Sequence, residues 1–336
     1  MSASPLVSVL LPARDAALTL PAALRSVRRQ RLADWECVIV DDGSRDDTLA
    51  VARAAAAADP RFVVSAQPPS GLVAALRTGL ARCRGTLVAR MDADDVMHRD
   101  RLELQVQALG AAPRLFAVGT HVRIFPRAQL AAGWRAYESW LNGITSADGV
   151  RAEAFVECPV VHPTLMMRRA ELVRLGYRDA GWPEDYDLVL RALARGLEIG
   201  VVPRRLLAWR DRPARLSRTG AVYALPRFTA IKATFLAEQF LARTDRYVLW
   251  GYGGTGRALR RALLAHGKRV SHVVEVHPGR LGNTIHGAPV VAPDALPRLD
   301  RLPVVVSVAR QRPREEIRAA MTAMGFRETT DFVCAA

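Results

Sequence analysis

Two clusters of acidic side chains stand out in the first hundred residues. Asp41-Asp42-Gly43-Ser44 follows one apolar run, and Asp92-Ala93-Asp94-Asp95 follows another. Three carboxylates within four residues repel one another unless a cation or a donor-rich ligand lies among them. Helix capping accounts for single acids such as Asp46 and Asp100, but it does not account for the second cluster. That cluster therefore predicts a site for a hard divalent cation, which prefers oxygen ligands.

A third acidic group, Glu184-Asp185-Tyr186-Asp187, lies at the predicted start of a helix. The helix macrodipole favours acids there without any function. Glu184 and Asp187 are therefore as consistent with helix stabilisation as with chemistry. His162 stands alone before Pro163-Thr164, and a lone histidine is more often structural than catalytic, so we treat it as a binding candidate.

A glycine-rich segment, Gly251-Tyr252-Gly253-Gly254-Thr255-Gly256, follows an apolar run and precedes a helical pattern. This context suits a phosphate-binding turn at a helix N-terminus. Glu275 is placed where an acid binds ribose in such folds. Two interpretations stay open: Gly251, Gly253, Gly256 and Glu275 bind a nucleotide, or the glycines only allow a strand and a helix to pack tightly.

Regular elements must position these residues. In the first half, apolar runs at residues 6–11, 37–40, 62–64 and 87–89 alternate with helical spacing at 20–31, 47–58 and 71–83. This alternation predicts an α/β fold with a mostly parallel sheet covered on both faces. Ligands bind at the carboxyl ends of such strands, where the first two acidic clusters lie.

The remainder of the chain has three parts. Residues 118–202 are irregular, with a clear helix only at about 184–195. A basic stretch at 204–218 precedes a helical pattern at about 221–243, and a second alternation fills residues 245–336. We therefore expect a domain at 1–218, a helical linker at 219–244 and a small α/β domain at 245–336.

Five motifs over about residues 5–218 resemble, in order and spacing, the inverting family 2 glycosyltransferases with the GT-A fold. They are Val7-Ser8-Val9-Leu10-Leu11-Pro12, Val40-Asp41-Asp42-Gly43-Ser44, Asp92-Ala93-Asp94-Asp95, His162-Pro163-Thr164 and Glu184-Asp185-Tyr186-Asp187. The resemblance implies transfer of a sugar from a nucleotide-diphosphate sugar to a hydroxyl acceptor, with inversion, in polysaccharide or glycoconjugate synthesis.

The resemblance also implies how the donor is bound. Pro12 and Asp42 would bind the nucleotide, and Asp92 would contact its ribose. Asp94 would ligate Mg²⁺ or Mn²⁺, which neutralises the growing charge of the leaving diphosphate. UDP is the default nucleotide, and GDP or dTDP stays open, because Arg14-Asp15 and Arg77-Thr78-Gly79 depart from the usual family pattern.

On the acceptor side, the resemblance makes Asp185 the catalytic base that takes the proton of the attacking hydroxyl. His162, Glu184 and Arg210 are expected on the acceptor or diphosphate side. An acid at a helix N-terminus has a lowered pKa, so such a base would act mainly through its position.

A second, shorter resemblance concerns residues 245–336. Ile285-His286-Gly287-Ala288-Pro289-Val290 is similar to a turn in the small nucleotide-binding domains of sugar acyltransferases and related sugar-modifying proteins. It implies a Rossmann-like domain. No catalytic triad or metal cluster accompanies the turn.

Almost half of the net charge of +15 lies in residues 203–244. Residues 203–244 carry 9 basic and 2 acidic side chains. Arg210, Arg212 and Arg215 could therefore contact a diphosphate of the donor or of a lipid-linked acceptor, and the helix after them could rest on an anionic membrane surface. The alternative is a solvated linker in a chain that uses Arg for 46 of its 48 basic residues.

Composition and motifs also bear on the location of the protein and on other classes of function. No run is long enough for a membrane span, and the N-terminus lacks the basic region of a signal peptide. We expect a cytoplasmic protein that can lie at the inner face of the membrane, with four reduced cysteines. No signature predicts nucleic-acid binding.

Two alternatives to a transferase remain. A sugar-nucleotide pyrophosphorylase would need a Gly-rich basic loop after the first strand, which Pro12-Ala13-Arg14-Asp15 does not supply. A catalytically inactive carbohydrate- or nucleotide-binding protein would not need Asp42, Asp92, Asp94 and Asp185 all intact.

Overall fold

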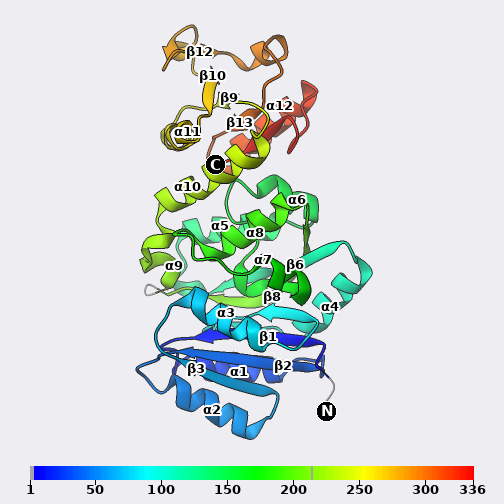
Figure 1. Ribbon diagram of the computed structural model, residues 1–336. Helices are drawn as coiled ribbons and strands as arrows, with labels where there is room; N and C mark the ends of the chain where they lie inside the picture. The colour runs from blue at the N-terminus through cyan, green and yellow to red at the C-terminus, as the bar shows by residue number, and fades with distance from the viewer. Residues whose placement is uncertain (1–3, 213–214) are drawn as a thin grey trace. The chain divides into compact units, whose positions relative to one another are not determined.

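The computed structural model describes residues 4–212 and 215–336, so residues 1–3 of the N-terminal segment and 213–214 of the basic stretch lie outside the described residues. The chain forms two compact units, whose elements are labelled in Figure 1. The first consists of the residues up to Val150, Val160–Ala180 and Glu184–Arg215, and the second of Arg151–Pro159, Gly181–Pro183 and Leu216–Ala336. The boundaries that the sequence predicts at residues 218 and 244 stay predictions.

The first unit is built on one eight-stranded sheet with the order β3-β2-β1-β4-β7-β6-β8-β5. Neighbours from β3 to β4 are parallel, as are β6 and β8, whereas β7 and β5 run antiparallel to their neighbours. The strands are β1 (Val7–Ala13), β2 (Trp35–Asp42), β3 (Phe62–Gln67), β4 (Leu87–Arg90), β5 (Val96–Met97), β6 (Leu115–Phe125), β7 (Met166–Arg168) and β8 (Glu198–Arg210). The helices are α1 (Leu20–Arg28), α2 (Thr48–Ala58), α3 (Leu72–Arg82), α4 (Arg101–Ala111), α5 (Ala132–Gly143), α6 (Ala147–Glu153, which crosses the unit boundary), α7 (Arg169–Leu175) and α8 (Glu184–Ala194), with short turns η1 (Arg127–Gln129) and η2 (His162–Thr164).

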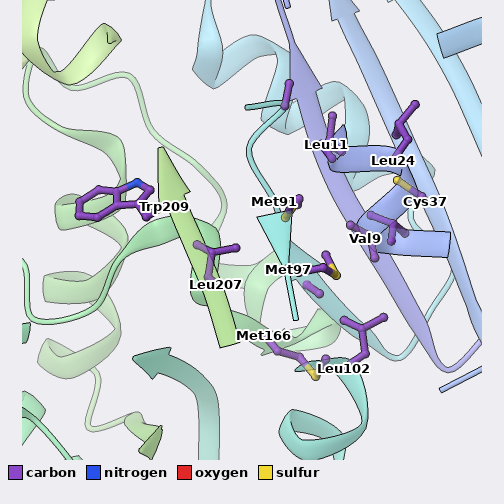
Figure 2. Packing of buried hydrophobic residues seen from close by; sticks show 14 of the residues in the cluster. Val9, Leu11, Leu24, Cys37, Met91, Met97, Leu102, Met166, Leu207 and Trp209 are labelled. Carbon is purple, nitrogen blue, oxygen red and sulfur yellow. The ribbon is translucent and has the colours of Figure 1, made fainter. Parts of the chain in front are cut away.

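Helices cover both faces of the parallel strands. Val9 and Leu11 of β1 belong to the same buried cluster as Leu24 of α1 (Figure 2). Leu10 points to the opposite face, because successive strand residues alternate. There Gly79 lets α3 approach: a Cβ on Gly79 would lie 2.3 Å from Leu10 Cδ1. Burial on both faces explains the continuous apolar runs, and the predicted α/β fold with a mostly parallel sheet is confirmed.

The expected irregularity of residues 118–202 is wrong. β6 and β8 pair in parallel from Leu115 to Phe125, and α5 and α7 are helices beyond the one predicted near 184–195. The register shifts after Leu115 and on both sides of His121. Such irregularities interrupt the two-residue alternation by which a strand is recognised.

The basic stretch at 204–218 is not simply a linker. Its residues up to Arg210 belong to β8. Arg204 Nη2 lies 3.7 Å from Asp100 Oδ2. The guanidinium of Arg215 lies over the ring of Trp209, 3.9 Å from the ring centroid. Several of these charges therefore have partners within the first unit.

A buried polar pair on α4 holds the centre of the first unit together. Arg101 is fully buried and donates to the carbonyl oxygen of Arg90 at 2.9 Å and to Gln105 Oε1 at 3.0 Å. Gln105 Nε2 donates at 2.8 Å to the carbonyl oxygens of Val118 and Thr164. One helix thus fixes the end of β4, the middle of β6 and the turn η2.

The second unit has a six-stranded sheet with the order β11-β12-β10-β9-β13-β14, parallel except between β11 and β12. Its strands are β9 (Arg246–Trp250), β10 (Arg269–Val274), β11 (Thr284–Ile285), β12 (Ala288–Val291), β13 (Val304–Val306) and β14 (Phe332–Cys334). Its helices are α9 (Leu216–Thr219), α10 (Leu225–Phe235), α11 (Gly254–Ala265) and α12 (Gln311–Ala323), with short turns η3 (Ala221–Tyr223), η4 (Leu236–Phe240), η5 (Pro278–Arg280) and η6 (Pro293–Arg298).

The sequence predicts a long helix at 221–243, but the helix that forms there is shorter. α10 begins at Leu225 and ends at Phe235, followed by a π-helical turn. Pro226 lies in the first turn, where its missing N–H breaks no hydrogen bond. Among the described residues, no helix combines the length and the apolar character needed to cross a membrane.

Lysine occurs only twice in the chain, and both side chains bind backbone oxygens of the second unit. Lys232 Nζ donates to the carbonyl oxygen of Val156 at 2.6 Å. Lys268 Nζ donates to those of Leu241 at 2.6 Å and Thr244 at 2.8 Å. A compact ammonium group directs its three N–H bonds to neighbouring carbonyls, whereas a guanidinium presents a planar fork.

Replacing Gln105 with alanine tests the role of α4. We expect Gln105→Ala to lower the free energy of unfolding by about 2 kcal/mol, because two buried carbonyls lose a donor. The control Gln107→Ala, on the exposed side of the same helix, should change it by less than about 0.5 kcal/mol. Urea unfolding measures both variants, and equal effects would contradict the assignment.

Candidate active site

Three carboxylates lie together directly after β4. One oxygen each of Asp92, Asp94 and Asp95 lies within 4.8 Å of the others. β4 pairs in parallel with β1, so this cluster lies at the carboxyl end of the parallel strands. That is where the sequence predicts it and where ligands of such sheets bind.

Arg90, the last residue of β4, forms a buried ion pair with Asp92. Burial raises the pKa of Asp92, but the charges of Arg90 and Arg215 and the hydrogen bond from Arg90 together lower it. Burial in turn would lower the pKa of Arg90, and the Asp92 carboxylate raises it. Both groups are therefore charged at neutral pH.

Arg210 and Arg212 bring positive charge to the other two acids. Arg212 Nε lies 3.1 Å from Asp94 Oδ2. The backbone N–H of Arg210 donates to Asp95 Oδ1 at 2.8 Å, and Arg210 Nε donates to the carbonyl oxygen of Asp94 at 2.7 Å. Arg210 was expected on the acceptor or diphosphate side, and its contacts place it beside the acidic cluster.

These residues fit a divalent cation. Burial and the charge of Asp92 raise the pKa of Asp94. Burial and both acidic neighbours raise that of Asp95 well above its usual value. Asp95 Oδ2 is buried and, within residues 4–212 and 215–336, has no hydrogen-bond partner. An oxygen-only donor set with an unsatisfied oxygen suits a hard cation, whose charge would reverse both shifts.

His162, Glu184 and Asp185 form a second cluster, with one ligand atom of each within 4.8 Å of the others. His162 begins the turn η2, and the two acids begin α8. His162 Nε2 lies 3.2 Å from the Tyr177 hydroxyl, and Nδ1 lies 3.5 Å from Glu184 Oε1. Burial raises the pKa of Tyr177, so its hydroxyl stays protonated. With the imidazole proton on Nδ1, His162 can donate to the Glu184 carboxylate and accept from the Tyr177 hydroxyl through Nε2.

Arg90 interacts electrostatically with both clusters. After burial, its charge is the next cause that lowers the pKa of His162. Besides Asp92, the Glu184 carboxylate raises the pKa of Arg90. The charge of one buried arginine thus acts on groups of both clusters, and the backbone N–H of Arg90 donates to the carbonyl oxygen of Leu165, directly after η2, at 2.8 Å.

Asp42, at the end of β2, is already held by the protein. Arg14 Nη1 lies 3.5 Å from its Oδ2. Its carboxylate accepts three further hydrogen bonds from the end of β3 and the segment after it, which are donated by Gln67 Nε2 and Ser70 N at 2.8 Å and by Gly71 N at 2.9 Å. Pro12 lies on the neighbouring strand β1, paired with Val40. The nucleotide-binding roles of Pro12 and Asp42 stay predictions.

Asp187 is structural. It is fully buried, and its two oxygens pair with Arg178 Nη2 at 2.5 Å and Arg191 Nε at 2.6 Å. Asp46 accepts a hydrogen bond from the N–H of Thr48 at the start of α2. Asp100 takes the N-cap position of α4 without forming a capping hydrogen bond.

The sequence motifs do not single out Arg90 and Tyr177, which the structure places beside the two clusters. Arg90 precedes Asp92 by two positions, a spacing that favours the same side of an extended chain, so the sequence did carry a signal for it. Tyr177 carries no such signal. It is 15 residues from His162, and the fold alone brings its hydroxyl to the imidazole.

In the second unit, the glycine-rich turn has two kinds of glycine. Gly251 has a φ of 90°, and a Cβ on Gly256 would lie 2.4 Å from the Gly251 carbonyl oxygen. These two allow strand and helix to pack closely. A Cβ on Gly253 would meet nothing within 4 Å. Glu275 follows β10 and accepts a hydrogen bond from Arg280 at 2.8 Å.

The lowered pKa of His162 predicts a pH dependence of stability. The unfolded chain binds a proton on this histidine near its usual pKa of 6.5, and the buried imidazole does not. The wild type should therefore lose stability relative to His162→Gln as the pH falls below about 6.5. Urea midpoints of both proteins at pH 7.5 and 5.5 measure this. A constant difference between the two would contradict a neutral buried imidazole.

Comparisons with known proteins agree with this geometry. Residues 8–175 match the family described as Glycosyl transferase family 2. EpsE of Bacillus subtilis (strain 168), named as a glycosyltransferase, is 31% identical over 58% of this chain and 69% of its own length. The amylovoran biosynthesis glycosyltransferase AmsE of Erwinia amylovora is 30% identical over 56% of this chain and 69% of its own.

Two solved structures share the fold. S. aureus TarS in complex with UDP-GlcNAc aligns with a TM-score of 0.54 and 16% identity, over 77% of this chain and 72% of that one. A mannosyltransferase of Pyrobaculum calidifontis, in complex with GDP-Man and Mn²⁺, aligns with a TM-score of 0.53 and 21% identity, over 79% and 70%. The fold of the first unit is thus GT-A, and the chain belongs to glycosyltransferase family 2.

Proposed function

We propose that this protein transfers a sugar, of the hexosyl type, from a nucleotide-diphosphate sugar to a hydroxyl acceptor with inversion, in polysaccharide or glycoconjugate synthesis. The observation that carries the proposal is the presence of both the Asp92–Asp94–Asp95 cluster and the His162–Glu184–Asp185 cluster in the first unit. Family membership favours transfer over pyrophosphorylase chemistry. The paired clusters favour catalysis over binding alone.

The acidic cluster would hold Mg²⁺ or Mn²⁺ through Asp94, with Asp92 and Asp95 beside it. When bound, the cation neutralises the diphosphate that leaves the sugar. Arg210 and Arg212, which now contact Asp94 and Asp95, would lie where they can donate to the same phosphate oxygens. Asp92 forms an ion pair with Arg90, and the ribose contact that the resemblance implies for it stays a prediction.

Asp185 would take the proton from the acceptor hydroxyl as that oxygen attacks the anomeric carbon. Its Oδ1 accepts a hydrogen bond from the backbone N–H of Tyr186 at 2.7 Å, which fixes the carboxylate at the start of α8. Attack from the face opposite the leaving diphosphate inverts the configuration. Glu184 and His162 would lie along the acceptor side, held by Tyr177.

UDP is the nucleotide that we propose first. Arg14 and the segment after β3 already satisfy the Asp42 carboxylate. A base bound at this acid would share its oxygens with these groups, so the loop between Gln67 and Gly71 is part of the nucleotide site that we propose.

For the second unit we propose a Rossmann-like domain that binds a nucleotide at the N-terminus of α11. The open position at Gly253 and the parallel order β12-β10-β9-β13-β14 support it. Glu275 would have to exchange its bond to Arg280 for the ribose. We also propose that the acceptor is linked to a lipid, and that the basic residues after β8 contact anionic lipid when this acceptor binds.

Asp94→Ala tests the donor site. It should weaken Mn²⁺-dependent binding of the preferred nucleotide sugar by at least about tenfold, measured by calorimetry across a panel of UDP-, GDP- and dTDP-sugars. Folding should be preserved, since the variant removes a carboxyl whose pKa is raised by repulsion and burial. Asp34→Ala, an exposed acid before β2, is the control. If the wild type binds no nucleotide sugar, the proposed function is wrong.

Asp185→Asn tests the base. The amide keeps the shape and cannot accept the proton, so we expect kcat to fall by about 100-fold or more with donor affinity retained. Asp179→Asn, an exposed acid six residues earlier, should leave both unchanged. Wild-type turnover by Asp185→Asn would refute the role of this carboxylate.

A further inference from the structure

The Arg90 guanidinium is unusual because it is buried and has few partners. Its side chain is 3% exposed. Asp92 is its ion-pair partner, and Nε has no hydrogen-bond partner among residues 4–212 and 215–336. A guanidinium has five N–H bonds, and leaving one unsatisfied in the interior disfavours folding. Such an arrangement points to a ligand that completes the hydrogen bonding.

The pair of Arg90 and Asp92 selects the chemistry of that ligand. A hydroxyl can donate its proton to the carboxylate and accept a hydrogen bond from the guanidinium at the same time. A phosphate oxygen only accepts, and the Asp92 carboxylate repels it. The pair carries no net charge, so it matches a neutral polyol better than an anion.

The surroundings of Arg90 distinguish between the two sugars of a donor. The backbone N–H of Arg90 donates to the carbonyl oxygen of Leu165 at 2.8 Å, directly after the turn η2. His162, which begins this turn, lies in one cluster with Glu184 and the proposed base Asp185. The sugar to be transferred must present its anomeric carbon to Asp185. The ribose lies at the other end of the diphosphate.

We propose that Arg90 and Asp92 form a subsite that binds a hydroxyl of the transferred sugar, in place of the ribose contact predicted for Asp92, so that Arg90 helps to select which sugar is transferred. This inference rests on the proposed function. It adds a residue that contacts the substrate at the junction of the two clusters. Arg90 would donate through Nε, and Asp92 would accept the hydroxyl proton.

Calorimetry in the presence of Mn²⁺ tests the subsite with two kinds of probe. UDP and GDP contain the ribose and the diphosphate, and UDP-glucose, UDP-GlcNAc and GDP-mannose add the sugar. For Arg90→Lys we expect affinity for the preferred nucleotide sugar to fall about tenfold or more. Affinity for the matching nucleoside diphosphate should change less than about twofold. The preference between the nucleotide sugars should shrink in parallel.

Arg84→Lys is the matched control. Arg84 lies before β4 and pairs with the buried Glu36 carboxylate at 2.7 Å, so the same substitution there also alters an arginine–carboxylate pair, away from the acidic cluster. It should leave all affinities unchanged. Arg90→Gln, which keeps N–H donors without the charge, provides a second test if the lysine variant folds poorly.

Three outcomes of the calorimetry would overturn the proposed subsite. Equal losses for nucleoside diphosphate and nucleotide sugar would place Arg90 at the ribose or diphosphate and overturn the inference. Unchanged affinities and sugar preference in Arg90→Lys and Arg90→Gln would also overturn it, while the proposed function stands. Failure of the wild type to bind any nucleotide sugar would instead overturn the proposed function, and the subsite with it.

Discussion

Mutual repulsion among three neighbouring carboxylates is the constraint on which the first unit depends. Burial and proximity both disfavour their charged forms, and cations from distant parts of the chain compensate. Arg90 comes from β4, Arg101 from α4, and Arg210 and Arg212 from the end of β8. Burial lowers the pKa of Arg101 to about 9, although Asp95 opposes this shift. The acidic motif therefore requires β8 to return to the end of β4.

The same connections join the two sides of the site. Gln105 and Arg101 bind the carbonyls that lead into the acidic cluster and into the turn η2. The end of β4 and the turn η2, on the proposed donor and acceptor sides, are thus attached to one helix. For a reaction in which an acceptor oxygen must approach one face of a sugar, fixed positions of the reacting groups provide much of the rate.

The sequence predicts the features that depend on neighbouring residues, and it misses those that depend on contacts between distant segments. β1 to β4 are predicted well, because strands buried on both faces are continuous apolar runs. β6 and β8 are missed, since register shifts near His121 break their alternation. The acids of the site are found because they are neighbours in the chain. Their pairing with distant cations is not found, since Arg212 meets Asp94 only through the sheet.

The two lysines give the second unit a distinctive chemical property. In a chain that uses arginine for 46 of its 48 basic side chains, Lys232 and Lys268 provide all of the side-chain amines. Both ammonium groups are held by backbone carbonyls of the second unit. An acylating reagent reacts with a free, neutral amine, so acylation of these side chains requires those hydrogen bonds to open. The rate of lysine acylation thus reports local opening of the second unit alone, because the first unit contains no lysine.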